Sequence, residues 1–254
     1  MTAIPYIDES WNVASGCSGK GCKCRDNCWA RDMVRRFPAI HHEQALRRDY
    51  DQDTPIGIER PFHEVVFHPD RLDKPLHWRK PRRIGVCFTG DLFDEQARGS
   101  WLYSIYPVMV EADWHTYFVL TKQVKRMAQW ISDTKNAWKN RTSHIWHGVS
   151  ICDQEDADRM IPELLRIPGK KWLSCEPLLG PIGLRVKWLK GINFVIIGCE
   201  SGPRRRPCKM EWVAHIVAQG KEAEIKIWVK QIDLNGKVCH DINLFPKELH
   251  PTCG

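Results

Sequence analysis

The chain of 254 residues is long enough to bury a large core, either as one α/β domain of barrel size or as two smaller domains. Its hydrophobic content of 43% and charged content of 27% are ordinary for a soluble globular protein and argue against a disordered or membrane-spanning chain. The 38 basic residues exceed the 31 acidic ones by seven, a modest excess that permits a nucleic-acid or nucleotide partner.

The N-terminal residues do not follow the pattern of a signal peptide, and no apolar run approaches membrane-spanning length. Eleven cysteines without an export signal predict reduced thiols in a cytosol rather than a disulfide framework. We therefore expect a cytoplasmic protein with no membrane partner.

The first predicted element is a cysteine-rich loop over residues 16–30, here called the cysteine loop. Its four cysteines fall within twelve residues, and they are Cys17, Cys22, Cys24 and Cys28. Thiolates bind soft metals, and a loop this dense in them can wrap one metal centre. Glycines within it let the backbone turn back, and neighbouring lysines would offset thiolate charge. The spacings of four, one and three intervening residues leave structural zinc and an iron–sulfur cluster both open.

Seven short apolar runs alternate with helical patterns along the rest of the chain. The runs span 64–67, 84–88, 116–120, 144–149, 171–174, 194–197 and 225–229. The helical patterns lie near 97–112, 123–139, 154–167 and 208–221. This alternation predicts right-handed βαβ units and a parallel sheet. We expect a single α/β domain over 1–254, a closed or partly open parallel (β/α) barrel of the TIM type, with an irregular C-terminal cover over about 234–254.

Polar side chains follow the apolar runs directly. In a parallel barrel the carboxyl ends of all strands open on one face, where active sites are built. We therefore expect one shared polar site beside the cysteine loop. Its candidate residues, in chain order, are Asp91, Lys122, Ser174, Glu176, Glu200 and Ser201.

Motifs spread over nearly the whole chain point to a family. They are WN at 11–12, GC at 16–17, CWA at 28–30, HPDRL at 68–72, WRKP at 78–81, GDLF at 90–93, LTK at 120–122, GVS at 148–150, SCEPLLGP at 174–181, GCESGP at 198–203 and KQ at 230–231. Through this set the sequence resembles the phage Gp37/Gp68-type proteins (DUF5131), which are common in phages and prophages. The resemblance implies a phage or prophage protein that works inside the host cell.

The three-cysteine loop and barrel pattern of that family are similar to those of radical SAM enzymes. The resemblance therefore implies a [4Fe–4S] cluster, S-adenosylmethionine and a protein that reduces the cluster. Three thiolates would leave one iron open to the amino and carboxylate groups of S-adenosylmethionine. The expected function is that of a radical SAM-like enzyme that modifies a nucleic-acid base, a nucleotide or a related substrate.

This sequence departs from the family at the cysteine loop, where the family has three cysteines separated by six and then two residues. Cys17 and Cys28 match the outer pair, but the span is one residue longer and two cysteines compete for the middle place. Cys24 keeps the first interval of six, and Cys22 keeps the preceding glycine. The middle ligand stays open between them.

The assignment gives roles to the remaining candidates. Trp29, beside a ligand, would pack on the cluster or on adenine. Contacts to the cofactor would come from Ser174, Glu200 and Ser201.

Substrate contact or proton transfer is expected of Asp91, Lys122 and Glu176. Two alternatives remain. In the first, the cysteine loop is a structural zinc clip on a nucleic-acid-binding protein. In the second, the strand-end carboxylates bind a different metal in a hydrolase or lyase.

Overall fold

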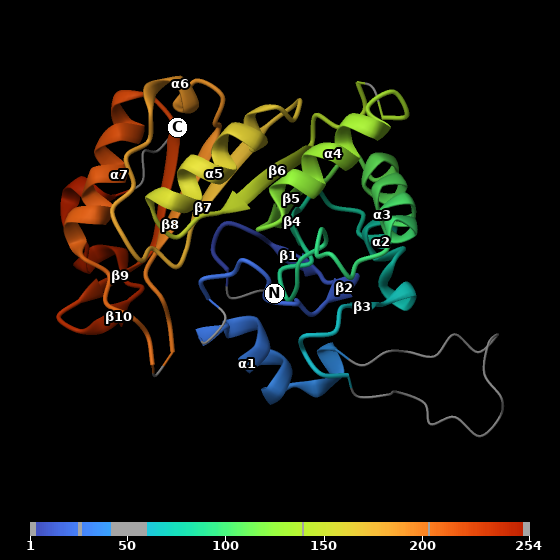
Figure 1. Cartoon of the computed structure of the whole chain (residues 1–254), viewed down its shortest axis with the longest axis horizontal. Coiled ribbons are helices and arrows are strands. Elements are labelled where there is room, and N and C mark those ends of the chain that lie inside the picture. Colours follow the sequence, from blue (N-terminus) through green and yellow to red (C-terminus); the bar gives the residue numbers. More distant parts are fainter. Residues whose placement is uncertain (1–3, 25–26, 42–59, 139, 203, 251–254) are drawn as a thin grey trace. The chain divides into compact units, whose positions relative to one another are not determined.

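The computed structural model describes residues 4–24, 27–41, 60–138, 140–202 and 204–250 (Figure 1). The chain divides into two units, which alternate along the sequence. The first unit comprises Met1–Gln123 and Trp138–Ile145, and the second comprises Val124–Ala137 and Trp146–Gly254.

The fold is mixed α/β with an eight-stranded, mostly parallel sheet, in the order β1-β4-β5-β6-β7-β8-β9-β10. The expectation of an α/β fold is confirmed, but a closed barrel is not found: no pairing joins β1 to β10 among the described residues. The reason lies in the last strand. β10 (Lys237–Cys239) turns back antiparallel on β9 (Lys226–Leu234) through Asn235 and Gly236, which both have positive φ and form a tight hairpin.

The first unit contains the parallel strands β1 (Glu9–Trp11), β4 (Arg83–Val86) and β5 (Thr116–Thr121). A separate two-stranded sheet pairs β2 (Ala14–Ser15) with β3 (Val66–Phe67). The run at 64–67 was expected to be the first strand of the parallel sheet, and this was wrong. The three residues of β1 take that place. They were not expected to form a strand because a strand this short shows no periodicity that a sequence pattern can detect.

The helices of the first unit are α1 (Trp29–Arg36), α2 (Lys74–His77) and α3 (Gly99–Glu111). α3 matches the helical pattern expected near 97–112. It buries Leu102, Ile105 and Met109, which repeat at helical spacing on its inner face. These side chains and the fully buried Trp11 belong to the core of this unit.

The second unit contains β6 (Ile145–Ser150), β7 (Lys171–Cys175) and β8 (Phe194–Gly198) in parallel with β9. Its helices are α4 (Val124–Thr134), α5 (Gln154–Leu165), α6 (Val186–Leu189) and α7 (Met210–Glu222). α4, α5 and α7 fall where helical patterns were expected. α5 begins cleanly because the Asp153 carboxylate accepts a hydrogen bond from the Asp156 N–H at 3.1 Å.

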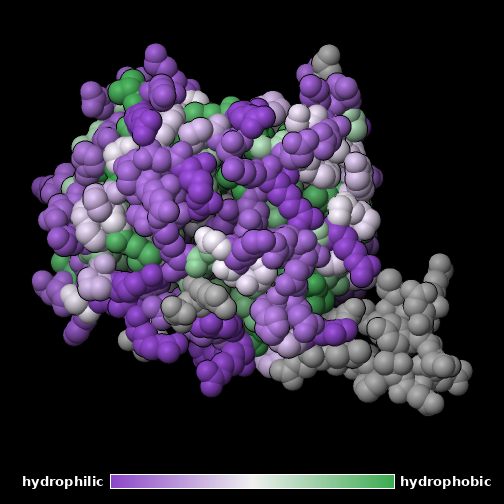
Figure 2. Space-filling model, in the orientation of Figure 1, coloured by the Kyte–Doolittle hydropathy of each residue, from purple (hydrophilic) through white to green (hydrophobic). Residues whose placement is uncertain are grey.

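The face drawn in Figure 2 is mainly hydrophilic, with scattered apolar side chains. Among the described residues, none of the helices has the length and apolar character needed to cross a membrane.

Candidate functional site

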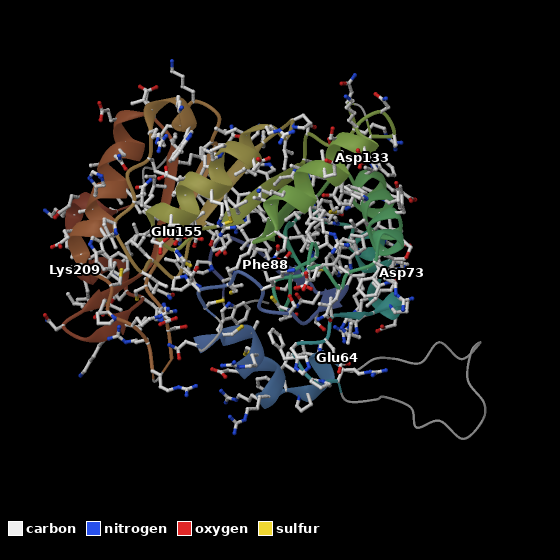
Figure 3. All side chains as sticks on the ribbon, viewed as in Figure 1. Glu64, Asp73, Phe88, Asp133, Glu155 and Lys209 are labelled. Atoms are coloured by element: carbon white, nitrogen blue, oxygen red, sulfur yellow. The ribbon has the colours of Figure 1, made fainter. Side chains whose placement is uncertain are left out.

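The cysteine loop begins directly after β2, where the backbone is tightly packed. Gly16 has a φ of +89°, and a Cβ added there would lie 2.3 Å from the Glu64 carbonyl oxygen. A Cβ at Gly90 would lie 2.6 Å from the Gly16 oxygen. Backbone hydrogen bonds join Gly16 N to Thr89 O at 3.1 Å and Asp91 N to Gly16 O at 3.2 Å. The start of the loop is therefore fixed to the segment after β4, and both glycines are required sterically. Glu64 is labelled in Figure 3.

The thiol of Cys24 interacts with two of the other thiols in the loop. The sulfur of Cys24 accepts hydrogen bonds from the thiols of Cys22 and Cys28, which holds the pKa of Cys24 well below its usual range. The pKa values of Cys22 and Cys28 are raised, because the thiol form donates to Cys24 and because both groups are buried from water. Cys24 is therefore the central thiol of the trio.

Cys17 has different neighbours. Its sulfur accepts a hydrogen bond from the Gly19 N–H at 3.4 Å. Burial raises the pKa of its thiol to about 12, and the carboxylates of Asp91 and Asp94 act in the same direction. The Lys122 ammonium group opposes this, and it also interacts electrostatically with Cys22 and Cys24. One lysine thus lies close enough to offset negative charge on three of the thiols.

The donor chemistry of the loop fits a thiolate-bound soft metal: sulfur ligands, half burial and a nearby cation. Over the described ranges, no group of three or more His, Cys, Asp or Glu side chains has the arrangement of a metal site. The thiols of Cys22, Cys24 and Cys28 instead share hydrogen bonds.

Residues after β4 and β5 hold the loop in place. The buried Asp94 carboxylate accepts two hydrogen bonds from Ser18, at 2.9 Å from its N–H and 2.8 Å from its hydroxyl. Glu95 pairs with the Lys20 ammonium group, and the Gln123 side-chain amide donates to the Lys20 carbonyl at 2.9 Å. Asp94 was not among the residues expected from the sequence, although it directly follows the GDLF motif that contains Asp91.

Asp91, expected to contact substrate, is buried and hydrogen-bonded to the segments that follow β4 and β5. Its Oδ1 accepts from the Thr121 hydroxyl at 2.6 Å and the Phe93 N–H at 3.0 Å, and its Oδ2 accepts from the Lys122 N–H at 2.9 Å. Burial raises the pKa of this carboxyl, and the three donors act in the opposite direction. Both oxygens are engaged in joining the ends of β4 and β5, an arrangement that suits positioning.

A buried polar chain lies immediately before the cysteine loop. The Ser15 hydroxyl is 2.8 Å from His41 Nδ1 and 2.7 Å from His68 Nε2. His41 Nε2 is 3.1 Å from the Pro61 carbonyl, which can only accept, so this nitrogen carries a proton. The Ser15 hydroxyl therefore links the two histidine rings. No local sequence pattern reports this chain, because His41 and His68 are 26 and 53 residues from Ser15.

The second unit brings Glu176 and Lys230 together in an ion pair. The pairing of β8 with β9 shifts between Ile197 and Gly198, which leaves Lys230 as the extra residue of a β-bulge. Gln231 also reaches Glu176 Oε1, at 3.4 Å. A Cβ at Gly198 would lie 3.2 Å from the Glu176 carboxyl carbon, so the glycine makes room for this carboxylate.

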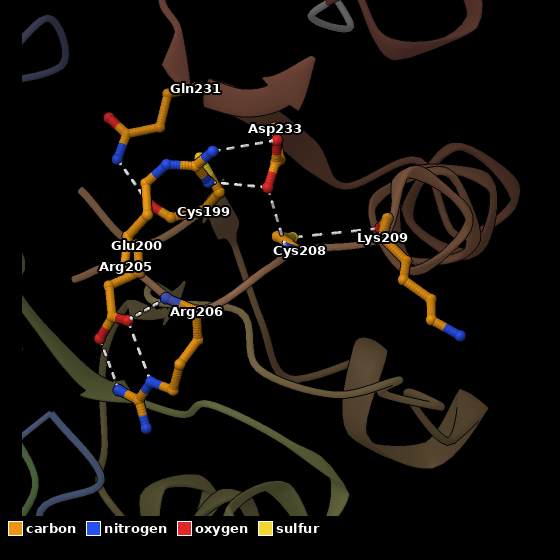
Figure 4. A network of polar contacts seen from close by, with 8 residues as sticks. All are labelled: Cys199, Glu200, Arg205, Arg206, Cys208, Lys209, Gln231 and Asp233. Atoms are coloured by element: carbon orange, nitrogen blue, oxygen red, sulfur yellow. Dashed lines mark hydrogen bonds and ion pairs between the residues drawn. The ribbon is translucent and has the colours of Figure 1, made fainter. Parts of the chain in front are cut away.

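A second polar network follows β8 (Figure 4). Arg206 binds the buried Glu200 carboxylate through its backbone N–H at 2.8 Å, its Nε at 2.9 Å and its Nη2. Arg205 binds both oxygens of Asp233, at 2.7 and 3.3 Å, and Asp233 Oδ2 also accepts from the Cys208 N–H at 3.4 Å. Glu200 is thus committed to Arg206.

The expected site residues fall into two sets. The first unit gathers the four cysteines, Asp91 and Lys122 around one loop, with Trp29 47% exposed at the start of α1. In the second unit, Ser174 and Glu176 lie at the end of β7, Glu200 follows β8, and Ser201 is exposed in the next loop. The single pocket shared by both sets stays a prediction.

No curated protein matches the sequence. Among solved structures, the chain is similar to "Spore photoproduct lyase complexed with dinucleoside spore photoproduct", with a TM-score of 0.42 and 9% identity. The similarity covers 74% of this chain and 55% of that one, so the chain spans little more than half the length of that protein. A family model described as "Protein of unknown function (DUF5131)" matches residues 1–241, as the motifs indicated. The chain belongs to the DUF5131 family.

Proposed function

We propose that the cysteine loop binds an iron–sulfur cluster and that the chain is a radical SAM-like enzyme acting on a nucleic-acid base, a nucleotide or a related substrate. The observation that carries this proposal is the thiol group centred on Cys24, which contacts Cys22 and Cys28 and interacts with the Lys122 cation. Thiolate clusters carry net negative charge, and a neighbouring ammonium group stabilises it. We assign the ligands as Cys17, Cys24 and Cys28, with Cys24 in the middle place.

The chemistry that a bound [4Fe–4S] cluster would supply is one-electron reductive cleavage of S-adenosylmethionine. The chain itself positions the loop. Asp94 holds Ser18, Gln123 holds the Lys20 carbonyl, and Gly16 and Gly90 allow the close backbone contact at its start. These contacts limit the motion of the segment that carries the ligands.

The cofactor contacts proposed here are side chains at the ends of β7 and β8. Glu200 is held by Arg206 and Ser174 is buried, which makes Ser201 and Glu176 the more available groups for hydroxyls of the ribose. Both hydrogen bonds that the described residues make to the Glu176 carboxylate go to Oε1, so Oε2 can accept a further donor. The proposal also includes a protein that reduces the cluster and a cytoplasmic setting in a phage-infected or lysogenic host.

The strand-end carboxylates fit the hydrolase or lyase alternative poorly. Asp91, Glu176 and Glu200 are each bound by hydroxyl, amide or cationic donors of this chain. Recruiting them as ligands for a metal would break those contacts and leave buried donors without partners.

Anaerobic purification followed by iron, sulfide and zinc analysis tests the proposal. We expect brown protein with about four irons and four sulfides per chain. Cys28→Ala should abolish the cluster, whereas Cys239→Ala, which removes a half-buried thiol from β10, should leave it intact. One zinc per chain, with no iron after anaerobic reconstitution, would overturn the proposal and support the zinc-clip alternative.

A further inference from the structure

The outer face of α1 combines aromatic and basic side chains. Trp29 at its start and Phe37 just beyond its end are each 47% exposed, while Ala30 and Val34 are buried on the opposite face. Trp29 and Arg36 are seven residues apart, which is two helical turns, so they share one side of the helix. Nitrogen-tipped side chains extend from this helix in Figure 3.

The charge of this face is positive. α1 contains three arginines and one aspartate, and Arg35 and Arg36 are both exposed in its last turn. The Arg36 guanidinium lies 5.3 Å from the centre of the Phe37 ring, a cation–π contact that holds a flat basic surface in place. The helix dipole accounts for arginines near the C-terminus of α1. It does not account for the exposure of the tryptophan and phenylalanine rings, which carry no charge.

We propose that this face, defined as Trp29, Arg35, Arg36 and Phe37, binds single-stranded nucleic acid. The two rings are about 12 Å apart along the helix, more than the 3.4 Å rise of one stacked nucleotide, so they contact different bases. Exposed rings stack on bases whose faces are open, and a duplex hides those faces. The arginines contact phosphates on either side.

This inference deepens the proposed function, because it places the substrate strand directly beside Cys28. It rests on the proposed function only for that role, since the binding itself requires no metal. We favour a nucleic-acid strand over a lipid surface because Met33, which is half-buried, is the one apolar residue of α1 between the two rings that is not buried, too little for the aliphatic stripe of a membrane-binding helix.

Fluorescence anisotropy of a fluorescein-labelled oligothymidylate of about twenty nucleotides, titrated with the full chain, tests the inference. Trp29→Ala should weaken binding about tenfold, and Trp29→Phe should retain most of it because the ring is kept. Arg35→Gln with Arg36→Gln should lower the slope of log affinity against log salt by about 1.4, as expected for two lost phosphate contacts on a single strand.

Two matched controls remove similar groups elsewhere. Tyr103→Ala removes a ring that is 59% exposed on α3, and Lys187→Gln with Lys190→Gln removes two exposed charges near α6. Both should leave oligothymidylate binding unchanged. Equal losses in the α1 variants and the controls would overturn the inference. So would duplex binding as tight as single-strand binding, or binding only to vesicles of anionic lipid.

Iron content measured on the same variants separates the two proposals. Protein that loads iron but does not bind oligothymidylate at low salt contradicts the α1 surface and leaves the enzyme proposal standing. Binding that depends on Trp29, in protein that takes up zinc but no iron, would support the α1 surface and overturn the enzyme proposal.

Discussion

Asp94 holds Ser18 by two hydrogen bonds to one carboxylate oxygen, one from the Ser18 N–H and one from its hydroxyl. The same carboxylate accepts the Gln96 N–H at 3.0 Å through its other oxygen. Asp94 therefore connects the cysteine loop to the turn after β4, and a carboxylate is needed because all three groups are donors.

Replacing Asp94 by Ala should weaken metal retention by the cysteine loop about 10- to 100-fold, the range seen when a residue that orients ligands is lost. Chelator competition on anaerobically loaded protein measures this. Ser18→Ala is the matched control: it removes only the hydroxyl donor, keeps the backbone N–H bond and should have a smaller effect. Retention equal to that of the unchanged protein in Asp94→Ala would show that the loop is held by other contacts.

Cys24 and Cys22 should differ sharply on substitution. Cys24→Ala removes the thiol that contacts both Cys22 and Cys28, so it should abolish most of the cluster absorbance and iron. Cys22→Ala removes a thiol that is hydrogen-bonded to Cys24 alone among the described cysteines, and most of the cluster should remain. Equal loss from both changes would indicate that four cysteines bind the metal, which leaves no open iron for S-adenosylmethionine and counts against radical chemistry.

The sequence predicted the elements with strong periodicity and missed those set by distant contacts. Residues 97–112 and 154–167 have clear helical patterns and form α3 and α5. β1 has three residues, and it joins the sheet through its pairing with β4, about 75 residues away, which no local pattern reports. The expected barrel failed at the chain end, where the Asn235–Gly236 turn folds β10 back on β9.

The candidate site shows the same division. Residue types and spacing brought the four cysteines together as candidates because they lie in one loop, and Lys122 became a candidate because it follows an apolar run; their role at a metal site stays a prediction. The roles of Asp94 and of the Ser15 hydrogen-bond chain depend on contacts across 26 to 76 positions. The β-bulge that places Lys230 beside Glu176 is a register shift, and single-sequence patterns do not encode register.

The ion pair of Glu176 and Lys230 should stabilise the second unit. Both side chains are about one fifth exposed, at 19% and 20%. Lys230→Met leaves a charged, half-buried carboxylate without its cation, and we expect a loss of roughly 2 kcal/mol, less than for a fully buried pair. Glu176→Gln removes the charge and keeps the shape, so it should cost less. Urea unfolding of both variants and of the double variant gives the coupling energy, and a value near zero would show that the pair contributes nothing.

Acid should remove the contribution of the Arg205–Asp233 pair. The hydrogen bonds from Arg205 hold the pKa of the Asp233 carboxyl below its ordinary value of 3.8. A carboxyl with a lower pKa in the folded state stabilises the fold above its unfolded pKa, and this stability is lost as the pH falls through the folded pKa. Asp233→Asn should therefore lower the free energy of unfolding by about 1 kcal/mol at pH 7, and the difference should shrink below about pH 4. Asp241→Asn, which changes an exposed acid in the same C-terminal region, is the control. Urea unfolding across this pH range measures both variants, and a difference for Asp233→Asn that stays constant down to pH 3 would contradict the assignment.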